Sequence, residues 1–230
     1  MNKIISFCLW GNNPKYLVGM SKNIQLAKEI YPDWKVKIFV DATVPMGYKF
    51  EYEENENVEV IRKFDEIGDW KFSLRRFEAA ENDDDIIILR DADSRLNYRE
   101  KAAVDEWLQS DKDFHVMRDH PYHKFVILAG MCGFRNGVLK DIKKVVDNYS
   151  NVNYNYGEDY NFLLNCVYPM VKNNMFIHDD GVWSDRKNIN HKFPIERGEG
   201  RELFIGQVFD ENDNQIKEHI ESLKQWLKNI

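Results

Sequence analysis

Short apolar runs and segments with helical periodicity alternate along the first half of the chain. Ile4 to Leu9 has the composition of a buried strand, and Leu17, Met20, Ile24 and Ala27 then recur at the spacing of one helix face. Further strands are predicted at Val36 to Val40, Val58 to Ile61 and Asp85 to Leu89, with a helix at Asp69 to Ala80. This β-α-β-β-α-β order predicts an α/β fold with a mostly parallel, doubly wound, Rossmann-like sheet flanked by helices.

The second half of the chain is less regular. Extended segments are predicted at Phe114 to Met117, Val126 to Phe134, Met175 to His178 and Leu203 to Phe209, and helices at Ala102 to Leu108, Val138 to Tyr149 and Asp159 to Val171. The stretch from Asp179 to Gly200 has little periodicity, and Ile216, Ile220, Leu223 and Leu227 mark a closing amphipathic helix. We therefore expect an irregular C-terminal segment followed by a terminal helix.

Composition limits the class of protein. With 230 residues and 43% hydrophobic residues the chain can form one sizeable core. Its net charge of -7 disfavours a broad basic surface, so we expect no nucleic-acid partner. Cys8, Cys132 and Cys166 are far apart and lack zinc-site spacing, which indicates reduced core residues. The apolar run at the N-terminus is too short for a transmembrane segment and lacks a signal-cleavage pattern, so a cytoplasmic location is expected.

The segment most informative about chemistry follows the strand at Asp85 to Leu89. Asp91 and Asp93 stand two residues apart, at the strand end where open α/β sheets bind ligands. Hard carboxylate oxygens at this spacing suit Mg²⁺ or Mn²⁺, which keep coordination positions open for substrate phosphates. A solvated acidic turn is the alternative interpretation of this pair.

The order of segments along the chain resembles the GT-A class of glycosyltransferases, in which Asp91-Ala92-Asp93 would be the DxD motif. The opening strand with Phe7, Leu9 and Trp10, followed by Gly-Asn-Asn, resembles the nucleotide-binding turn of that class. Residues 70–77 resemble the helix that sends a basic residue toward the donor. Residues 128–134 are similar to the Gly-containing strand that lines the sugar pocket in glycogenin-like relatives, and Gly157-Glu158-Asp159 resembles the acidic pair aimed at the acceptor.

The resemblance covers about residues 1–210 and implies a metal-dependent glycosyltransferase. Such an enzyme moves a sugar from a nucleoside-diphosphate sugar, with uridine diphosphate the expected nucleotide, to a hydroxyl of a carbohydrate or glycoconjugate acceptor. The single domain, 1–230, would then comprise a nucleotide-binding half over 1–95, a sugar and acceptor half over 96–210 and a C-terminal helix over 211–230. The implied cofactor is Mn²⁺ or Mg²⁺.

The resemblance also implies roles for particular residues. It implies catalytic Asp159 and Glu158, metal ligands Asp91, Asp93 and His178, donor-binding Phe7, Leu9, Trp10, Lys71, Arg75, Ala92, Gly130 and His191, and sugar- or acceptor-binding Arg118, Asp119, His120 and Trp183. Lys71 and Arg75 would share one face of an α-helix while Arg76 points elsewhere. Asp159 would be the general base of an inverting enzyme, although helix capping also explains the Glu158-Asp159 pair.

Two features of the resemblance stay open. The glycogenin-like His-x-x-Gly-x-x-Lys-Pro sequence is absent, so the third metal ligand is either His178 or His191 and the stereochemical outcome is undecided. The polar stretch from Asp179 to Gly200 contains basic, aromatic and histidine side chains. We expect it to act as a lid that orders over metal and nucleoside diphosphate together.

Two alternatives belong to other classes of protein. An apolar strand that ends in Asp-x-Asp is also the nucleophile motif of haloacid-dehalogenase phosphatases, in which Asp91 would attack phosphorus, Asp93 would act as general acid and Asp179, Asp180 and Asp185 would bind metal. That family opens with this strand, whereas three strands precede it here. A catalytically silent nucleotide- or sugar-binding module would keep the pocket without the metal ligands.

Overall fold

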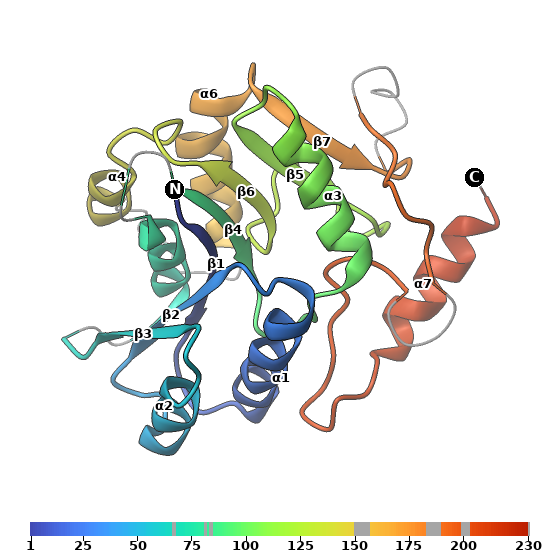
Figure 1. The fold of residues 1–230 in the computed structure, drawn as a ribbon. Coiled ribbons are helices and arrows are strands. Elements are labelled where there is room, and N and C mark those ends of the chain that lie inside the picture. Colours follow the sequence, from blue (N-terminus) through green and yellow to red (C-terminus); the bar gives the residue numbers. More distant parts are fainter. Residues whose placement is uncertain are drawn as a thin grey trace.

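A seven-stranded β-sheet with helices on both faces forms the centre of the molecule (Figure 1). The computed structural model describes residues 1–65, 68–80, 82, 85–149, 157–182, 190–198 and 203–229. The strands are β1 (Lys3–Leu9), β2 (Lys35–Asp41), β3 (Val58–Lys63), β4 (Ile86–Arg90), β5 (Phe114–Arg118), β6 (Met131–Arg135) and β7 (Met175–Asp179), in the spatial order β3-β2-β1-β4-β6-β5-β7.

The sheet is mostly parallel, as the sequence predicts. Strands β1 to β4 run parallel to one another, and β5 is parallel to β7. Strand β6 is antiparallel to both β4 and β5. Its first residue, Met131, pairs with the last residue of β4, Arg90. The loop before β6 and the turn after β4 therefore meet at one edge of the sheet.

Side chains of β1 alternate between two hydrophobic cores. Ile5, Phe7 and Leu9 pack in the core beneath α1 (Pro14–Ile30) and α3 (Tyr98–Gln109). Ile4 and Cys8 face the other core, which lies under η1 (Trp70–Ala79), α4 (Ile142–Asn148) and the helical run over residues 158–171. This alternation follows from the two-residue period of a strand, and it explains why β1 and β4 are nearly continuous apolar runs.

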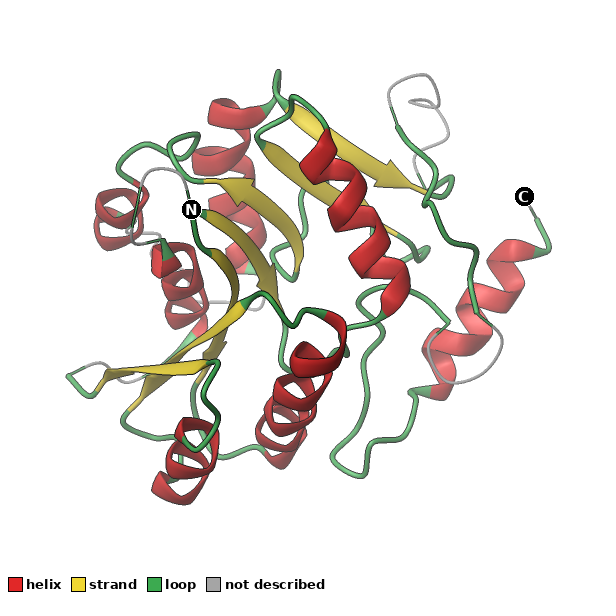
Figure 2. Cartoon of the chain, viewed as in Figure 1, coloured by secondary structure: helices red, strands yellow, loops and turns green. Residues whose placement is uncertain are grey.

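The remaining helices are α2 (Met46–Glu53), α5 (Glu158–Phe162), α6 (Tyr168–Val171) and α7 (Lys217–Leu227), and Figure 2 shows helices flanking the strands on both sides. A π-helical turn, η2 (Leu163–Val167), joins α5 to α6. The sequence pattern gave no sign of α2, because this short helix buries only Lys49 and Tyr52 and has no apolar stripe. The expected strand over residues 203–209 is absent from the described part of that segment, which contributes isolated bridges at Val208 and Phe209.

The C-terminal segment lies against the turn that contains Asp91 and Asp93. The amide of Phe209 donates to the carbonyl of Asp93 at 2.9 Å, and Val208 forms a bridge with Ser94. Arg95 donates to the Asp213 carboxylate at 2.9 Å. The C-terminal segment is thus bonded to the turn around Asp93, although the bonded residues are about 115 positions apart in the chain.

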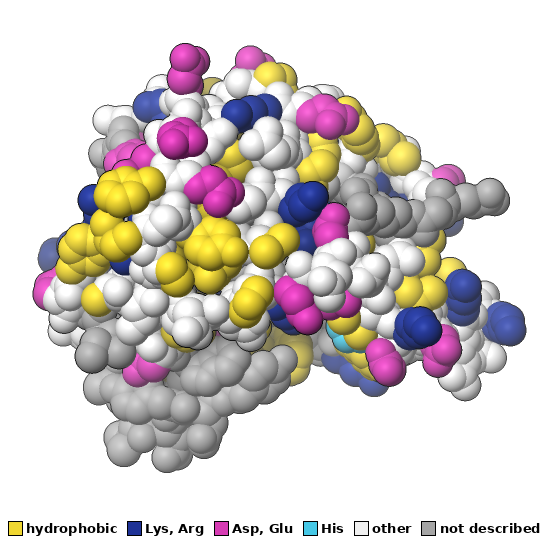
Figure 3. All heavy atoms as spheres, turned by 90° about the horizontal axis from the view of Figure 1, so that it is seen from below, with side chains coloured by type: hydrophobic (Ala, Val, Ile, Leu, Met, Phe, Trp, Pro, Cys, Tyr) yellow, Lys and Arg dark blue, Asp and Glu magenta, His cyan; other side chains and the backbone are white. Residues whose placement is uncertain are grey.

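The molecular surface carries charges of both signs. On the face in Figure 3, Lys and Arg side chains are interspersed with Asp and Glu, and hydrophobic side chains gather in between. Among the described helices, none is both long and apolar enough to cross a membrane.

Candidate active site

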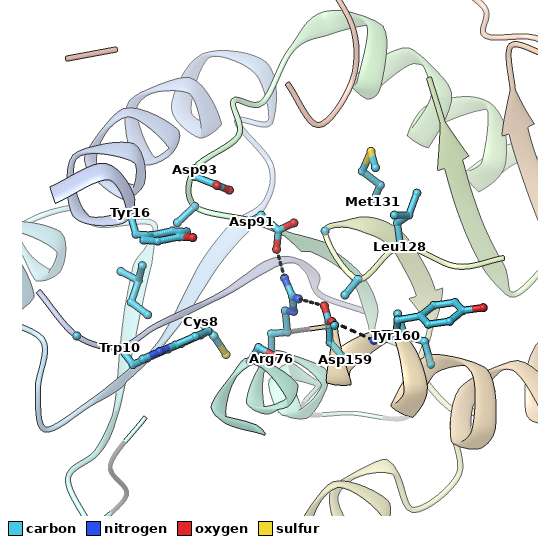
Figure 4. Close-up of a pocket in the computed structure, with 18 of the residues that line it drawn as sticks. Cys8, Trp10, Tyr16, Arg76, Asp91, Asp93, Leu128, Met131, Asp159 and Tyr160 are labelled. Carbon is cyan, nitrogen blue, oxygen red and sulfur yellow. Dashed lines mark hydrogen bonds and ion pairs between the residues drawn. The ribbon is translucent and has the colours of Figure 1, made fainter. Parts of the chain in front are cut away.

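A cavity of about 590 Å³ opens where β1, β4 and β6 bring their loops together. It lies at the carboxyl ends of β1 and β4, where the fold class places ligands. The side chains around it are shown in Figure 4. Its walls come from the turn after β1, η1, the turn after β4, residues 125–131 and the start of α5, and they comprise Cys8, Leu9, Trp10, Gly11, Asn12, Asn13, Tyr16, Ser73, Arg76, Asp91, Ala92, Asp93, Phe125, Ile127, Leu128, Ala129, Gly130, Met131, Gly157, Asp159, Tyr160 and Leu163.

Asp91 and Asp93 both line this cavity because the chain turns immediately after β4. The amide of Ser94 donates to the Asp91 carbonyl at 3.2 Å, and the Ser94 hydroxyl donates to the same carbonyl at 2.8 Å. Arg90, the residue before the turn, is buried and donates to Glu100 of α3 at 2.8 Å. This buried ion pair anchors the end of β4 on one face of the sheet while Asp91 projects into the cavity.

Helix α1 holds the turn from the other side. The Asn23 amide group donates to the Ser94 carbonyl at 2.8 Å, and its oxygen accepts from the Leu96 amide at 3.0 Å. The Ala92 carbonyl approaches Gly19 so closely that a Cβ there would lie 2.1 Å from its oxygen. Both contacts rigidify the backbone that carries the two aspartates, which favours a precise binding geometry.

Gly130 fits against the carboxylate of Asp91. A Cβ at Gly130 would lie 1.9 Å from Oδ2 and 2.4 Å from Cγ of Asp91. The backbone before β6 and the Asp91 side chain therefore share space that only glycine leaves open.

The basic residue that helix η1 sends into the cavity is Arg76, whereas the sequence pattern pointed to Lys71 and Arg75. Arg76 donates to Asp91 Oδ1 at 2.5 Å, and its Nη2 lies 3.9 Å from Asp159 Oδ2. Arg75 points away, to Glu78 at 2.5 Å and Asp147 at 2.6 Å, and Lys71 does not line the cavity. The structure does not bring Lys71 and Arg75 to the cavity wall, because η1 is a 3₁₀-helix, in which residues three apart share a face. Ser73 and Arg76 accordingly both line the cavity.

Asp159 lies across the cavity from the two turn aspartates, at the start of α5 (Figure 4). Burial raises the pKa of Asp159 above its ordinary value, and the opposing charge of Arg76 moderates the shift. Arg76 thus lies between Asp91 and Asp159 and links the two sides of the cavity electrostatically. The side chain of Glu158, the other expected catalytic residue, lies outside the described structure.

Lys15, which the sequence pattern did not single out, pairs with the second aspartate. Its Nζ lies 2.7 Å from Asp93 Oδ2, in the first turn of α1. Burial and the neighbouring Asp91 raise the pKa of Asp93, and Lys15 acts in the opposite direction. Each carboxylate of the turn therefore has its own resident cation.

Most of the expected donor-binding residues near β1 and β4 are brought together. Leu9, Trp10, Ala92 and Gly130 all line the cavity. Phe7 does not, because it points into the core under α1 and is fully buried. Leu9 lies on the same face of β1 as Phe7, but it reaches the cavity because the cavity begins only where β1 ends.

His178 and His191 are not brought to Asp91 and Asp93. The His178 ring is buried in β7, with Nδ1 2.8 Å from His115 Nε2 and Nε2 3.1 Å from Glu106 Oε2. The exposed His191 ring stacks on Phe176 with centroids 3.9 Å apart. Neither residue lines the cavity, so the structure brings neither to the position expected of the third metal ligand, nor His191 to that expected of a donor contact. Strand β7 lies at the sheet edge, three strands from β4.

Arg118, Asp119 and His120 are buried in a network of hydrogen bonds and ion pairs. Arg118 donates to Asp179 at 2.7 Å, and His120 Nε2 lies 2.9 Å from the carbonyl of His219. Asp119 accepts from Arg99, Arg197 and the amide of Ile205. These bonds attach the C-terminal segment to the end of β5, and none of the three residues lines the cavity. Trp183 lies outside the described residues.

The predicted lid over Asp179 to Gly200 is described only in part. The carboxylate of Asp179 accepts from the amides of Gly181 and Val182, at 3.0 and 2.7 Å. Arg197 reaches Asp119 and Asp180. These contacts hold the described portions against β5 and β7, and residues 183–189 and 199–200 lie outside the description.

Helix α7 carries a further histidine, His219, whose ring lies beside those of His120 and Tyr122. Burial and the charge of Lys15 lower the pKa of His219, whereas Glu218 and Asp93 act to raise it.

The donor atoms at the cavity fit a divalent cation only in part. Asp91 and Asp93 supply hard oxygen ligands, and Gly130 leaves room for the Asp91 carboxylate. Within the described residues, no three histidine, cysteine or acidic side chains cluster closely enough to hold a metal by themselves. A cation bound here would therefore complete its coordination with substrate oxygens and water, as Mg²⁺ commonly does.

The chain matches no known family profile and no curated protein sequence. Solved structures share its fold. A glycosyltransferase involved in the glycosylation of the major capsid of PBCV-1 aligns over 78% of this chain and 82% of its own, with 13% identity and a TM-score of 0.50. The S. aureus TarS 1-349 fragment aligns over 78% of this chain, with 14% identity and a TM-score of 0.54, and the match spans 58% of that fragment.

This is a GT-A-type α/β fold. A putative glucose-1-phosphate thymidylyltransferase from Bacillus anthracis is also similar, with 12% identity over 77% of this chain and 86% of its own and a TM-score of 0.50. Identities this low relate folds only. The reaction has to be inferred from the residues around the cavity.

Proposed function

We propose that the protein is a glycosyltransferase that binds a nucleoside-diphosphate sugar in the cavity at Asp91 and Asp93. The sugar would be transferred to a hydroxyl of a carbohydrate or glycoconjugate acceptor. The observation that carries the proposal is Arg76, which joins the Asp91 carboxylate to the side of the cavity that holds Asp159. A cavity of about 590 Å³ is within the usual range for small-molecule sites.

We assign binding of the donor diphosphate to Asp91, Asp93 and the cationic side chains beside them. The two carboxylates would hold Mn²⁺ or Mg²⁺, whose chemistry there is to neutralise charge on the leaving nucleoside diphosphate. Arg76 is buried and held by two hydrogen bonds, to the Arg90 carbonyl and Asp91, so it can present a fixed positive charge to the donor.

We assign binding and deprotonation of the acceptor to Asp159 and two aromatic rings. Asp159 is the proposed general base that takes the proton of the attacking hydroxyl in an inverting reaction, and its raised pKa brings it closer to that task. The rings of Phe125 and Tyr160 lie 4.3 Å apart at the cavity wall. Such rings offer apolar faces on which an acceptor sugar can stack.

Uridine diphosphate is the nucleotide that we propose first. The sequence resemblance implies it, and the similar TarS 1-349 fragment also has a structure in complex with UDP. Trp10 and Tyr16 line the cavity near the end of β1 and are suited to stack on a base.

The phosphatase alternative loses its support. Two of its metal ligands would be Asp179 and Asp180, but these pair with Arg118 and with Arg99 and Arg197, and neither lines the cavity. The strand before Asp91 is the fourth in the chain and occupies the centre of the sheet.

A donor screen tests the proposal without knowledge of the acceptor. Slow transfer to water should release nucleoside diphosphate from one or a few nucleotide-sugars in the presence of Mn²⁺, and chelation should stop it. Asp91→Asn should abolish the release, while Asp111→Asn, which changes an 86% exposed carboxylate, should leave it intact. Release that persists in Asp91→Asn would refute the proposal, and turnover of a nucleoside triphosphate with a sugar 1-phosphate would indicate a nucleotidyltransferase instead.

A further inference from the structure

Lys15 occupies the position beside Asp93 that a bound cation would need. Its Nζ lies 2.7 Å from Asp93 Oδ2, and the two side chains are 27% and 13% exposed. The pair is therefore shielded from water on most sides, which makes it stronger than an ordinary surface ion pair.

The charges around the cavity nearly balance in the free protein. Among the described side chains, three carboxylates, Asp91, Asp93 and Asp159, face two cations, Lys15 and Arg76, which leaves a net charge of -1. A divalent cation alone would change this to +1, and a nucleotide-sugar with about two negative charges alone would change it to about -3. Bound together, they restore about -1.

We propose that Lys15 is a displaceable counter-ion that couples the binding of divalent cation and donor diphosphate. In the free protein Lys15 holds Asp93, and in the loaded site Lys15 releases Asp93 and pairs with the diphosphate. The inference rests on the proposed function, because it takes the ligand at this cavity to be a nucleoside diphosphate with its cation.

Lys15 is placed for such a move, and Arg76 is not. Lys15 is in the first turn of α1, after the Asn13 cap, and its flexible stem carries a single terminal charge. Gly11, Asn12 and Asn13 line the cavity just before it, so the positive end of this 17-residue helix also faces the ligand. Arg76 has a side chain only 5% exposed and is fixed by its own bonds.

Coupling of this kind has a measurable consequence. When Mn²⁺ binds to the wild-type protein without nucleotide, it displaces the Lys15 ammonium from Asp93, and no diphosphate is present to pair with that ammonium. Mn²⁺ alone therefore binds weakly. Nucleoside diphosphate and Mn²⁺ each raise the affinity for the other by the same factor, because coupling between two sites is reciprocal. Removing the Lys15 charge should strengthen Mn²⁺ binding in the absence of nucleotide. It should also reduce the factor by which nucleoside diphosphate and Mn²⁺ raise each other's affinity.

The experiment compares Lys15→Met with wild type by electron paramagnetic resonance of free Mn²⁺ and by calorimetry with each common nucleoside diphosphate. We expect Lys15→Met to bind Mn²⁺ alone about tenfold more tightly and to lose about tenfold in the coupling factor. Lys15→Arg keeps the charge and should behave like wild type. Lys28→Met is the matched control, because Lys28 is an exposed lysine of the same helix that contacts Asn55.

The outcomes separate this inference from the proposed function. Mn²⁺ binding that Lys15→Met leaves unchanged or weakens, in a variant with wild-type circular dichroism and melting temperature, overturns the counter-ion role while metal-dependent donor binding can stand. Failure of the wild-type protein to bind any nucleoside diphosphate overturns the proposed function and the coupling with it.

Discussion

Gly130 offers a direct test of the Asp91 site, because a methyl group added at Gly130 would occupy the place of the Asp91 carboxylate. The Cβ of Gly130→Ala would lie 1.9 Å from Asp91 Oδ2, whereas ordinary contacts begin at 3.4 Å. The carboxylate therefore has to retreat by about 1.5 Å (3.4 - 1.9). Gly130 is not among the glycines with positive φ, so the added methyl group is the main perturbation.

The expected cost in stability is modest and the expected cost in function is large. The Asp91 side chain is 51% exposed and can move toward solvent. We therefore expect about 1–2 kcal/mol of destabilisation from overpacking and the weakened pair with Arg76. That corresponds to a melting temperature lower by roughly 2–8 °C for a chain of this size. A displacement of this kind at the reacting centre costs on the order of 100-fold in rate.

Gly47→Ala is the matched control. Gly47 is in α2, and a Cβ there meets no atom within 4 Å. The control should keep wild-type donor turnover and gain up to about 1 kcal/mol from the better helix propensity of alanine. Thermal melts and nucleotide-sugar hydrolysis, measured on both variants, decide the matter. Wild-type turnover by folded Gly130→Ala would refute the placement of Asp91 at the reaction centre.

Further predictions concern the other charged groups of the cavity. Asp93→Asn should abolish donor turnover at saturating Mn²⁺ with little change in melting temperature, and wild-type turnover would contradict the metal-ligand role. Asp159→Asn should reduce transfer to acceptor at least 100-fold while calorimetry shows donor affinity nearly unchanged; equal losses would reassign it to donor binding. Arg76→Met should weaken nucleoside-diphosphate binding by roughly tenfold to 100-fold, whereas Arg75→Met should not, and equal effects would contradict the 3₁₀ geometry. Because the folded pKa of Asp93 is raised, Mn²⁺-dependent donor binding should fall as pH decreases through a value above that of an ordinary aspartate. The same sign means that protonation of Asp93 favours the folded state, so the melting temperature should not drop in that window on its account.

The sheet and the position of the two aspartates could be predicted from the sequence because both depend on local pattern. Ile86 to Leu89 is an uninterrupted apolar run, as a central strand requires, and Asp91 and Asp93 follow it directly. The fold class, with a mostly parallel sheet, is confirmed. Local pattern did not distinguish a 3₁₀-helix from an α-helix. The 3₁₀ geometry directs Arg76 into the cavity, where the sequence pattern had pointed to Arg75.

The differences between the expected and the observed positions of these residues have a common physical origin in long-range packing. His178 ends a strand, which made it a plausible ligand, yet that strand lies at the sheet edge and its histidine is committed to His115 and Glu106. Arg118 and Asp119 have the chemistry of a sugar site, but Arg118 pairs with Asp179 of β7 and Asp119 pairs with Arg197. No periodicity in the sequence could reveal which charged groups pair across the fold.

The bond from Phe209 to Asp93 has a consequence for how the protein matures during synthesis. Strands β1 to β4 are all synthesised before residue 91, but the amide that donates to the Asp93 carbonyl belongs to residue 209. Contacts between residues so far apart in the sequence form late in folding, because closing the long loop costs entropy before the contact contributes any stabilisation. A nascent chain that stops short of that segment would carry the two aspartates on an unfinished turn. The turn that carries Asp91 and Asp93 would thus be complete only after residue 209 has been synthesised.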